Sequence, residues 1–300
     1  VDLKGIEANL AAIKALVRPE VKVMAVVKAN AYGNGAIEVA KAVAGAGADR
    51  LAVATLDEAV ALREAGLKLP ILVLGTSIPG DGVDAAVHYD ITQALCTVEL
   101  AEALSKAAQH LHKPAQVHLK IDTGMGRIGV RPSEAVSFMK QVAGLPGLQF
   151  EGIFSHFAAA DEAENEYTNR QQSRFREALA SLNRHGYTFS LRHLANSAGI
   201  LDHPEAHFDM VRPGCILYGY WPGPDTKRKI TLRPTLALKT RIVYQKTVPA
   251  GTAVSYGLTY TTPSERVLAT LPIGYADGYR RGLSNKGHVL IRGQRCPVVG

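Results

Sequence analysis

Apolar and polar positions alternate in a regular way through most of the chain. Short runs of branched apolar residues are separated by longer stretches rich in Ala, Leu and Glu, for example residues 97–112 and 174–183. These stretches favour helices, and each apolar run is short enough to be one strand. The expected strands are residues 21–27, 51–54, 71–74, 91–95, 116–121, 150–155, 190–194 and 208–212.

This alternation predicts the fold class. A repeating strand and helix favour a parallel sheet with right-handed crossovers, and eight such units match the size of a TIM (β/α)8 barrel. A doubly wound open sheet is the competing arrangement, and the number of units favours closure into a barrel. Before the first strand, Leu10, Ile13, Leu16 and Val17 mark one face of an additional helix.

The pattern changes after residue 226. Strand-like segments at 236–247, 267–271 and 288–291 are separated by turn signals, with no helical stretch between them. We therefore expect an α/β barrel over residues 1–226 and the first part of a mostly β domain over residues 227–300. The chain lacks an initiator Met and ends in CPVVG, which resembles the middle of an element. We expect a protein that is trimmed at both ends.

Composition narrows the function classes. The 300 residues are 47% hydrophobic and 20% charged, which is enough for a large core. The apolar runs are far shorter than the roughly 20 residues of a membrane span. The net charge is +7, but the basic residues are scattered, which favours small anionic ligands over nucleic acid. No Cys/His spacing predicts a metal site, and three sparse cysteines fit the reducing cytoplasm.

Unusual polar residues gather at one predicted rim of the barrel. In this fold, catalytic groups lie just after the strands, and phosphate is held near strands seven and eight. Such residues follow five strands: Lys28 follows the first, Lys120 and Arg127 the fifth, His156 the sixth, Asn196 and Ser197 the seventh, and Arg212 and Gly214 the eighth. Together they predict one site on the C-terminal face.

A glycine motif in the fifth unit needs its own interpretation. Residues 124–129, GMGRIG, match the dinucleotide-binding pattern G-x-G-x-x-G. In that motif the helix begins within the glycines, whereas here VRPS follows, with Ser133 as the expected cap of a helix that begins at Glu134. We therefore expect glycines that let the loop bring Arg127 close to a ligand, rather than a nicotinamide site.

Six segments of the chain resemble one known family. AVVKANAYGNG, LKIDTGMGRIG, SHFAAAD, ANSAG, VRPGCILYG and AVSYGLTY are similar to motifs of alanine racemases, and they occur along the entire chain in the expected order. That family consists of pyridoxal-phosphate enzymes with a barrel and a C-terminal β domain. The resemblance implies an isomerase that interconverts L-alanine and D-alanine, with pyridoxal 5'-phosphate as its cofactor.

The resemblance also implies how the cofactor is held. Lys28 would form an imine with it, which requires a neutral amine, and burial lowers the pKa of a lysine. Contacts to the cofactor phosphate are implied for Tyr32, for Ser197 and for the backbone amides around Gly214 and Cys215. Hydroxyls and free amides in the loops after strands seven and eight suit an anion.

Arg212 is implied to contact the pyridine nitrogen of the cofactor. Because arginine only donates hydrogen bonds, that nitrogen would stay unprotonated and the ring would be a weaker electron sink. His156 and His193 are expected to support this arginine, and Asn196 to hydrogen-bond nearby. Arg127 is implied to hold the cofactor's phenolic oxygen and the region of the substrate carboxylate.

Racemisation needs proton exchange on both faces of the substrate α-carbon, and therefore two acid/base groups. The resemblance assigns Lys28 to the D-isomer and Tyr256 to the L-isomer. In this family the tyrosine reaches the active site of a second subunit, which implies a homodimer with composite sites. Lys120 matches a lysine that is carbamylated in many members, and a carbamate would make it a partner for Arg127.

Three rival functions stay open. A decarboxylase of the same fold type would hold the pyridine nitrogen with a carboxylate, which Arg212 disfavours. A non-catalytic pyridoxal-phosphate binding protein shares the barrel but lacks the β domain and the opposing tyrosine. A broader racemase acting on serine, lysine or arginine is the main alternative. The sequence does not separate a role in supplying D-alanine for the cell wall from alanine catabolism.

Overall fold

The computed structural model describes residues 1–80, 82–162 and 165–300. The chain divides into two compact units, Val1–Leu236 and Ala237–Gly300, and each is described by itself. The domain limits expected from the sequence, 1–226 and 227–300, stay a prediction.

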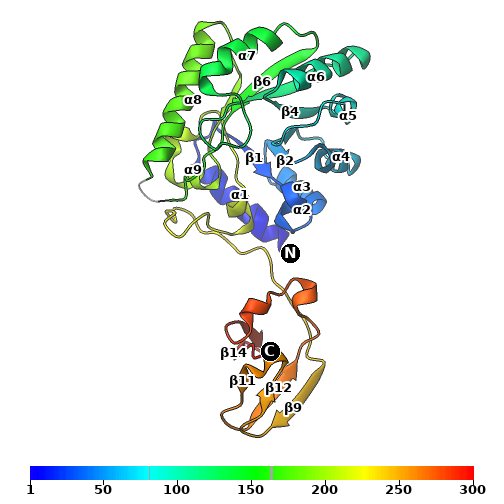
Figure 1. The fold of residues 1–300 in the computed structure, drawn as a ribbon, viewed down its shortest axis with the longest axis vertical. Coiled ribbons are helices and arrows are strands. Elements are labelled where there is room, and N and C mark those ends of the chain that lie inside the picture. The colour runs from blue at the N-terminus through cyan, green and yellow to red at the C-terminus, as the bar shows by residue number, and fades with distance from the viewer. Residues whose placement is uncertain (81, 163–164) are drawn as a thin grey trace. The chain divides into compact units, whose positions relative to one another are not determined.

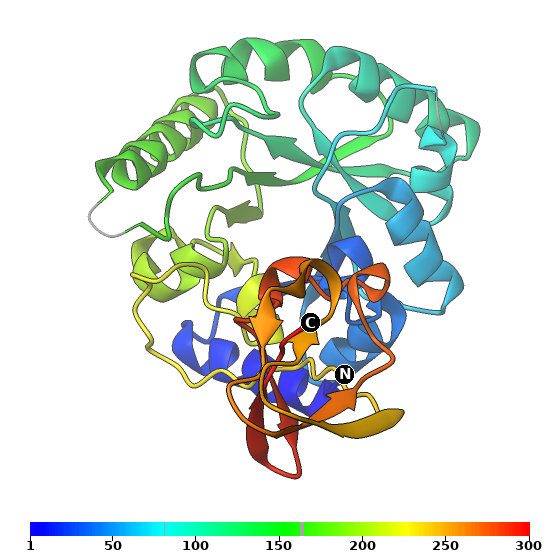
Figure 2. The same ribbon diagram turned by 60° about the horizontal axis from the view of Figure 1, so that its bottom comes forward.

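The first unit is a nearly closed barrel of eight parallel strands (Figures 1 and 2), which confirms the predicted fold class. Strand β1 pairs with both β2 and β8, so the sheet curls back on itself. Between β7 and β8 the backbone is joined by single hydrogen bonds, from Asp209 N to Arg192 O at 3.0 Å and from Arg212 N to Ala195 O at 3.1 Å. The strands are β1 Lys22–Val26, β2 Arg50–Val53, β3 Ile71–Val73, β4 Ile91–Leu95, β5 Ala115–Lys120, β6 Leu148–Phe154, β7 Leu191–His193 and β8 Met210–Val211.

Helices cover the outside of this ring, as Figure 2 shows. Because side chains alternate across a strand, Met24 and Val26 of β1 join the cluster inside the barrel, whereas Val23 and Ala25 pack outward against helices. Such strands are buried on both faces, which explains their continuous apolar runs. The α-helical segments are α1 Leu3–Leu16, α2 Lys28–Tyr32, α3 Ala36–Gly45, α4 Leu56–Glu64, α5 Val83–His88, α6 Val98–His110, α7 Ala135–Val142, α8 Glu166–Arg184 and α9 Ser197–Asp202. Short 3-10 helices are η1 Pro132–Glu134, η2 Pro204–Ala206 and η3 Cys215–Tyr218.

The second unit, Ala237–Gly300, consists of three antiparallel strand pairs: β9 with β12, β10 with β11 and β13 with β14. The strand expected at 236–247 is wrong over 236–243, where the described chain has no regular structure and regular pairing starts only at Tyr244. Leu238 and Ile242 are exposed there, so apolar content alone did not identify a paired segment. The elements are β9 Tyr244–Val248, β10 Ala253–Val254, η4 Tyr256–Leu258, β11 Tyr260–Thr261, β12 Arg266–Thr270, η5 Tyr275–Asp277, η6 Arg281–Leu283, β13 His288–Ile291 and β14 Gln294–Pro297.

A search of the described helices for a membrane span found no candidate that is both long and apolar enough. The longest helix, α8, has 19 residues and carries many charged and polar side chains.

Candidate active site

The barrel brings most of the predicted site residues to one rim, because parallel strands end on the same face. Lys28 lies just beyond β1, and Lys120 is the last residue of β5. His156 lies just beyond β6, Ser197 begins α9 after β7, and Arg212 directly follows β8. The rim is therefore formed by five different β-α connections.

The segment after Lys28 is wound with the opposite hand to an ordinary helix. Ala29, Asn30 and Ala31 have φ values of 51°, 53° and 53° and ψ values of 52°, 45° and 50°, and Tyr32 has φ 56°. This left-handed conformation costs roughly 1–2 kcal/mol for each residue other than glycine. It is held by two side chains: Asn30 Oδ1 accepts from Ala36 N at 2.9 Å, and Glu58 Oε1 accepts from Ala29 N at 2.6 Å.

Glu58 links the Lys28 loop to the next β-α unit. Its other oxygen accepts from Ala54 N at 2.7 Å, and it forms a capping box with Thr55 at the start of α4. We did not predict Glu58 as a site residue, although Thr55 followed by Glu58 three positions later is a recognisable capping signal. The pKa of Lys28 is lowered, first by burial and then by the positive charge of Arg127, while Glu58 acts in the opposite direction.

A second group of residues forms a small polar cradle beside this turn. The Tyr32 ring stacks on Tyr218 with centroids 4.9 Å apart, and Tyr218 is a contact that the sequence did not suggest. A Cβ atom added to Gly214 would lie 2.7 Å from the Tyr32 hydroxyl oxygen and 3.8 Å from Ser197 Oγ. Only glycine therefore fits between these hydroxyl groups without displacing one of them.

The start of α9 contributes to the same cradle. Ser197 Oγ accepts a hydrogen bond from Gly214 N at 2.9 Å, which ties the loop after β7 to the loop after β8. The cap of this helix is Asn196, whose side chain accepts from Gly199 N at 3.0 Å. Burial raises the pKa of the neighbouring Cys215 thiol, so this thiol is biased toward its neutral form.

Arg212 lies 2% exposed at the base of the rim. Its Nη1 lies 2.7 Å from His193 Nδ1, and its Nη2 lies 3.2 Å from His156 Nδ1. Nη2 also donates to the carbonyl oxygens of Ser155 and Leu194, at 2.7 and 3.0 Å. No carboxylate forms an ion pair with Arg212 among the described residues. Burial lowers the pKa of Arg212 to about 9, so the guanidinium is still mainly charged at neutral pH.

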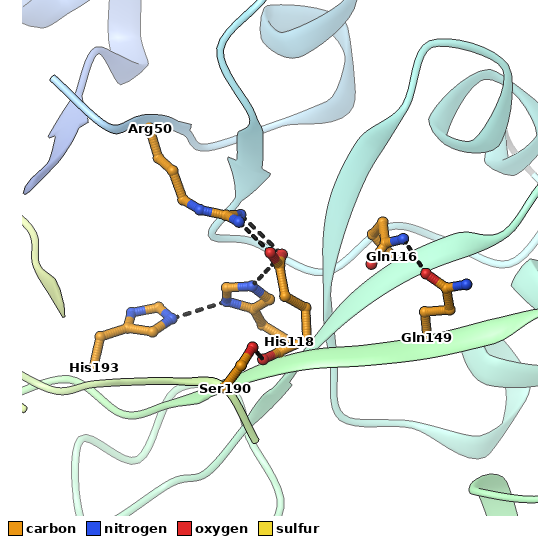
Figure 3. A network of polar contacts seen from close by, with 7 residues as sticks. Arg50, Gln116, His118, Gln149, Ser190 and His193 are labelled. Atoms are coloured by element: carbon orange, nitrogen blue, oxygen red, sulfur yellow. Dashed lines mark hydrogen bonds and ion pairs between the residues drawn. The ribbon is translucent and has the colours of Figure 1, made fainter. Parts of the chain in front are cut away.

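His193, which contacts Arg212, is also the first member of a chain of hydrogen-bonded polar groups (Figure 3). His193 Nε2 lies 2.9 Å from His118 Nδ1, and His118 Nε2 lies 3.2 Å from Glu151 Oε2. Glu151 in turn forms a two-pronged ion pair with Arg50. Our sequence analysis did not find His118, Glu151 or Arg50, because they come from three strands whose pairing only the folded barrel reveals.

Lys120 is 4% exposed and faces the ring of Phe154, with Nζ 4.6 Å from the ring centroid. Burial, and then the charge of Arg212, lowers the pKa of Lys120 to about 7. A substantial fraction of this amine is therefore neutral near physiological pH. Phe154 also lies beneath the Arg212 guanidinium, 5.5 Å from centroid to Cζ, so one aromatic ring faces both cations.

Arg127 extends from the glycine loop and is exposed. The loop is folded around Asp122, whose carboxylate accepts from Gly124 N at 2.9 Å and from Gly126 N at 3.0 Å. No helix begins within the glycines, so the loop lacks the strand-to-helix turn of a dinucleotide-binding motif. The predicted cap at Ser133 is wrong: this residue lies inside η1, and α7 begins at Ala135. Pro132 occupies the first turn of η1, a position that suits its fixed φ.

Tyr256 belongs to the second unit, Ala237–Gly300. It begins η4 and is 81% exposed. The preceding Ser255 has φ 65°, in the left-handed region.

The rim residues fit the cofactor that the sequence implied. The cradle at Gly214, Tyr32 and Ser197 has hydroxyl groups and a helix start that suit a phosphate, and adding one Cβ would fill it. Lys28 has a lowered pKa, as a lysine that must react with an aldehyde requires. Arg212 presents a buried donor group without a carboxylate, which suits an unprotonated aromatic nitrogen.

The chain resembles known proteins along its full length. Residues 1–222 match the family described as alanine racemase, N-terminal domain, and residues 235–300 match alanine racemase, C-terminal domain. An alanine racemase from Desulforamulus reducens is 50% identical over 302 residues, which cover 100% of this chain and 81% of the relative. One from Methanococcus maripaludis is 45% identical and covers 100% of this chain and 80% of the relative.

Solved structures agree with these sequence relatives. An alanine racemase of Clostridium difficile 630 has a TM-score of 0.95 at 40% identity, covering 100% of this chain and 78% of its own. The enzyme of Bacillus anthracis with bound L-Ala-P has a TM-score of 0.91 at 40% identity, with coverage of 100% and 78%. A histidine racemase from Leuconostoc mesenteroides subsp. sake has a TM-score of 0.89 at 32% identity, with coverage of 98% and 79%. Matched in both domains by sequence and by fold, the chain belongs to the alanine racemase family.

Proposed function

We propose that the protein interconverts L-alanine and D-alanine with pyridoxal 5'-phosphate as cofactor, using Lys28 and Tyr256 as its two acid/base groups. Arg212 is the observation that carries this proposal: it is a buried guanidinium whose partners are histidines and carbonyl groups. When bound, the cofactor withdraws electrons from the substrate α-carbon and so makes its proton removable.

The residues of the rim divide the remaining work. Lys28 would hold the cofactor covalently and, once released from it, would act as one acid/base group; burial and the charge of Arg127 lower its pKa, which favours the neutral amine. Tyr32 and Ser197 bind the phosphate together with the amides around Gly214 and Cys215. Their hydroxyl groups already lie beside Gly214 without any rearrangement of the barrel.

Arg212 would influence which reaction follows proton removal. A guanidinium would donate a hydrogen bond to the ring nitrogen and transfer no proton to it, which would favour return of a proton to the α-carbon over side reactions. His156 and His193 hold Arg212 in place, and burial with nearby cations keeps the pKa of both well below the usual value. Both rings can therefore accept hydrogen bonds from Arg212.

Tyr256 acts on the opposite face of the substrate from Lys28, and we propose that it comes from a second copy of the chain. Its 81% exposure within one chain supports an interface role, because a catalytic phenol needs surroundings that exclude water. The active enzyme is then a homodimer with composite sites. Arg127 would orient the substrate carboxylate from the glycine loop.

Lys120 is proposed to carry a carbamate. A neutral amine is the form that reacts with carbon dioxide, and the pKa of about 7 provides it near neutral pH. The negative carbamate would offset the positive charges of Arg127 and Arg212, which otherwise repel the Lys120 ammonium.

A broader racemase is the second candidate function. The histidine racemase relative has the same fold at 32% identity, so this fold alone does not restrict the substrate to alanine. A decarboxylase is disfavoured because it would hold the pyridine nitrogen with a carboxylate, whereas we assign that contact to the guanidinium of Arg212. The cytoplasmic location stays a prediction, supported by three free thiols at Cys96, Cys215 and Cys296. A role in supplying D-alanine for the cell wall also stays a prediction.

Chiral chromatography across an amino-acid panel tests the proposed activity. We expect L- and D-alanine to interconvert faster than serine, lysine, arginine or histidine, with solvent deuterium entering the α-position and no release of carbon dioxide. Lys28→Ala should abolish the visible absorbance of the bound cofactor, and Tyr256→Phe should abolish turnover while that absorbance persists. A faster reaction with another amino acid, or release of carbon dioxide, would show that the activity is misassigned.

A further inference from the structure

Behind the active-site rim, five buried or half-buried groups form one continuous chain through the barrel: Arg212, His193, His118, Glu151 and Arg50. His118 and His193 are both fully buried. Arg50 is the first residue of β2, and together with Glu151 it lines a cavity of about 580 Å³ where strands of the barrel begin. The chain therefore runs from the active-site rim to the opposite end of the barrel.

The hydrogen-bond chemistry allows only one direction along this chain. Arginine has no acceptor, so His193 Nδ1, 2.7 Å from Arg212 Nη1, must be unprotonated. A neutral His193 then carries its proton on Nε2 and donates it to His118 Nδ1 at 2.9 Å. His118 in turn carries its proton on Nε2 and donates it to the carboxylate of Glu151 at 3.2 Å.

Charge supports this assignment at every link. Burial, together with neighbouring arginines, lowers the pKa of His118 and His193, which keeps both rings neutral. Hydrogen bonds from His118 and Arg50 lower the pKa of Glu151 to about 2, which keeps the carboxylate an acceptor. A doubly protonated His118 would direct its Nδ1–H at the Nε2–H of His193, and the hydrogen bond between the two rings would be lost. No other protonation pattern therefore keeps the same number of hydrogen bonds.

We propose that Glu151 is a positioning residue for Arg212. By accepting from His118 it fixes the tautomers of both histidines, so that His193 always presents a lone pair to the guanidinium. Without this acceptor, His118 can carry its proton on Nδ1, His193 then carries its proton on Nδ1, and that proton faces Arg212. Hydrogen bonds in such a chain also polarise one another, which lets the Glu151 carboxylate stabilise the Arg212 cation across two rings.

The effect on catalysis rests on the proposed function, whereas the tautomers do not. Nitrogen-15 NMR of the cofactor-free, histidine-labelled protein measures them directly. We expect both His118 and His193 as single neutral tautomers with the proton on Nε2. A proton on Nδ1 of His193, or a doubly protonated ring at neutral pH, in the unaltered protein would overturn the proposal whatever the variants do.

The variant that removes the acceptor is Arg50→Met combined with Glu151→Leu, because replacing both members of an ion pair leaves no unpaired buried charge. We expect a second tautomer of His193 to appear. Under the proposed function, kcat should fall about tenfold while KM changes less than about twofold. A tenfold loss corresponds to about one hydrogen bond to a charged group. Glu151→Asp keeps the carboxylate and should retain the single tautomer.

Gln149→Ala is the matched control, since Gln149 lies on the same strand, lines the same cavity and bonds to Gln116 outside the chain (Figure 3). It should leave the histidine signals unchanged. An unchanged His193 tautomer in the double variant would refute the role of Glu151. Correct tautomers in a protein that racemises no amino acid would instead leave this inference intact and overturn the proposed function.

Discussion

The buried histidines of the first unit predict that acid destabilises it well before its carboxylates titrate. Burial lowers the pKa of His118, His156, His193 and His207 in the folded protein. The unfolded chain takes up a proton on each ring as the pH falls through about 6.5, whereas the native rings stay neutral. Because the unfolded state then binds more protons, the free energy of unfolding must decrease as the pH falls.

The size of this effect follows from proton counting. Each ring that is protonated only in the unfolded state contributes about 1.4 kcal/mol per pH unit below its unfolded pKa. Between pH 7 and pH 5, the two rings whose pKa is lowered furthest, His156 and His193, should lower the free energy of unfolding by about 4 kcal/mol. His118 and His207 act in the same direction. Glu151 adds nothing in this window: its pKa is lowered from 4.5 to about 2, so its stabilisation is lost only between those values.

Trp221, the only tryptophan, lies in the first unit and reports its unfolding alone. Urea titrations of cofactor-free protein at pH 7, 6 and 5, followed by its fluorescence, give the free energy of unfolding. His118→Gln should make the pH effect smaller, since it removes one of the titrating rings, and Gln149→Ala should leave it unchanged. A stability that is flat or rising between pH 7 and pH 5 would refute the assignment of neutral buried rings.

Three further predictions concern the rim. Gly214→Ala places a Cβ 2.7 Å from the Tyr32 hydroxyl oxygen; cofactor affinity, titrated by visible absorbance, should fall about tenfold because such overpacking costs about 1–3 kcal/mol, and an unchanged affinity would contradict the phosphate cradle. Glu58→Ala removes the acceptor for Ala29 N and the capping box of α4; the free energy of unfolding from Trp221 fluorescence should fall by about 1–2 kcal/mol, and no loss would mean that this clamp is not stabilising. Lys120 should gain the mass of carbon dioxide when native mass spectra are recorded with bicarbonate, and Lys120→Arg should not; an equal gain in both would place the adduct elsewhere.

Most of the barrel could be predicted from the sequence because its strands are buried on both faces. Continuous apolar runs such as residues 23–27 and 71–73 can be recognised as strands without any knowledge of their partners. Lys28, Arg212 and Ser197 could be placed on one rim for the same reason, since parallel strands fix which loops meet. Residues 236–243 were wrongly predicted as part of a strand, because their exposed apolar side chains produce the same sequence pattern as a paired strand.

The remaining features depend on contacts that sequence spacing does not encode. His118 and Glu151 are separated by 33 positions and meet only through the pairing of β5 with β6. The left-handed turn after Lys28 is built from Ala and Asn, of which Ala ordinarily favours the right-handed helix. Tyr256 could be assigned a role only through the family resemblance, because it belongs to the second unit and not to the β-α connections that form the rim.

That reversed turn has a consequence for how the chain tolerates change. Ala29, Asn30, Ala31 and Tyr32 hold a mirror-image conformation, so a D-amino acid built into this stretch by chemical synthesis would relax it where an L-residue is under tension. Glycine, which has no handedness, would do the same for the exposed Ala29. The chain therefore holds a short left-handed segment of L-residues directly after Lys28, the lysine to which we assign the cofactor.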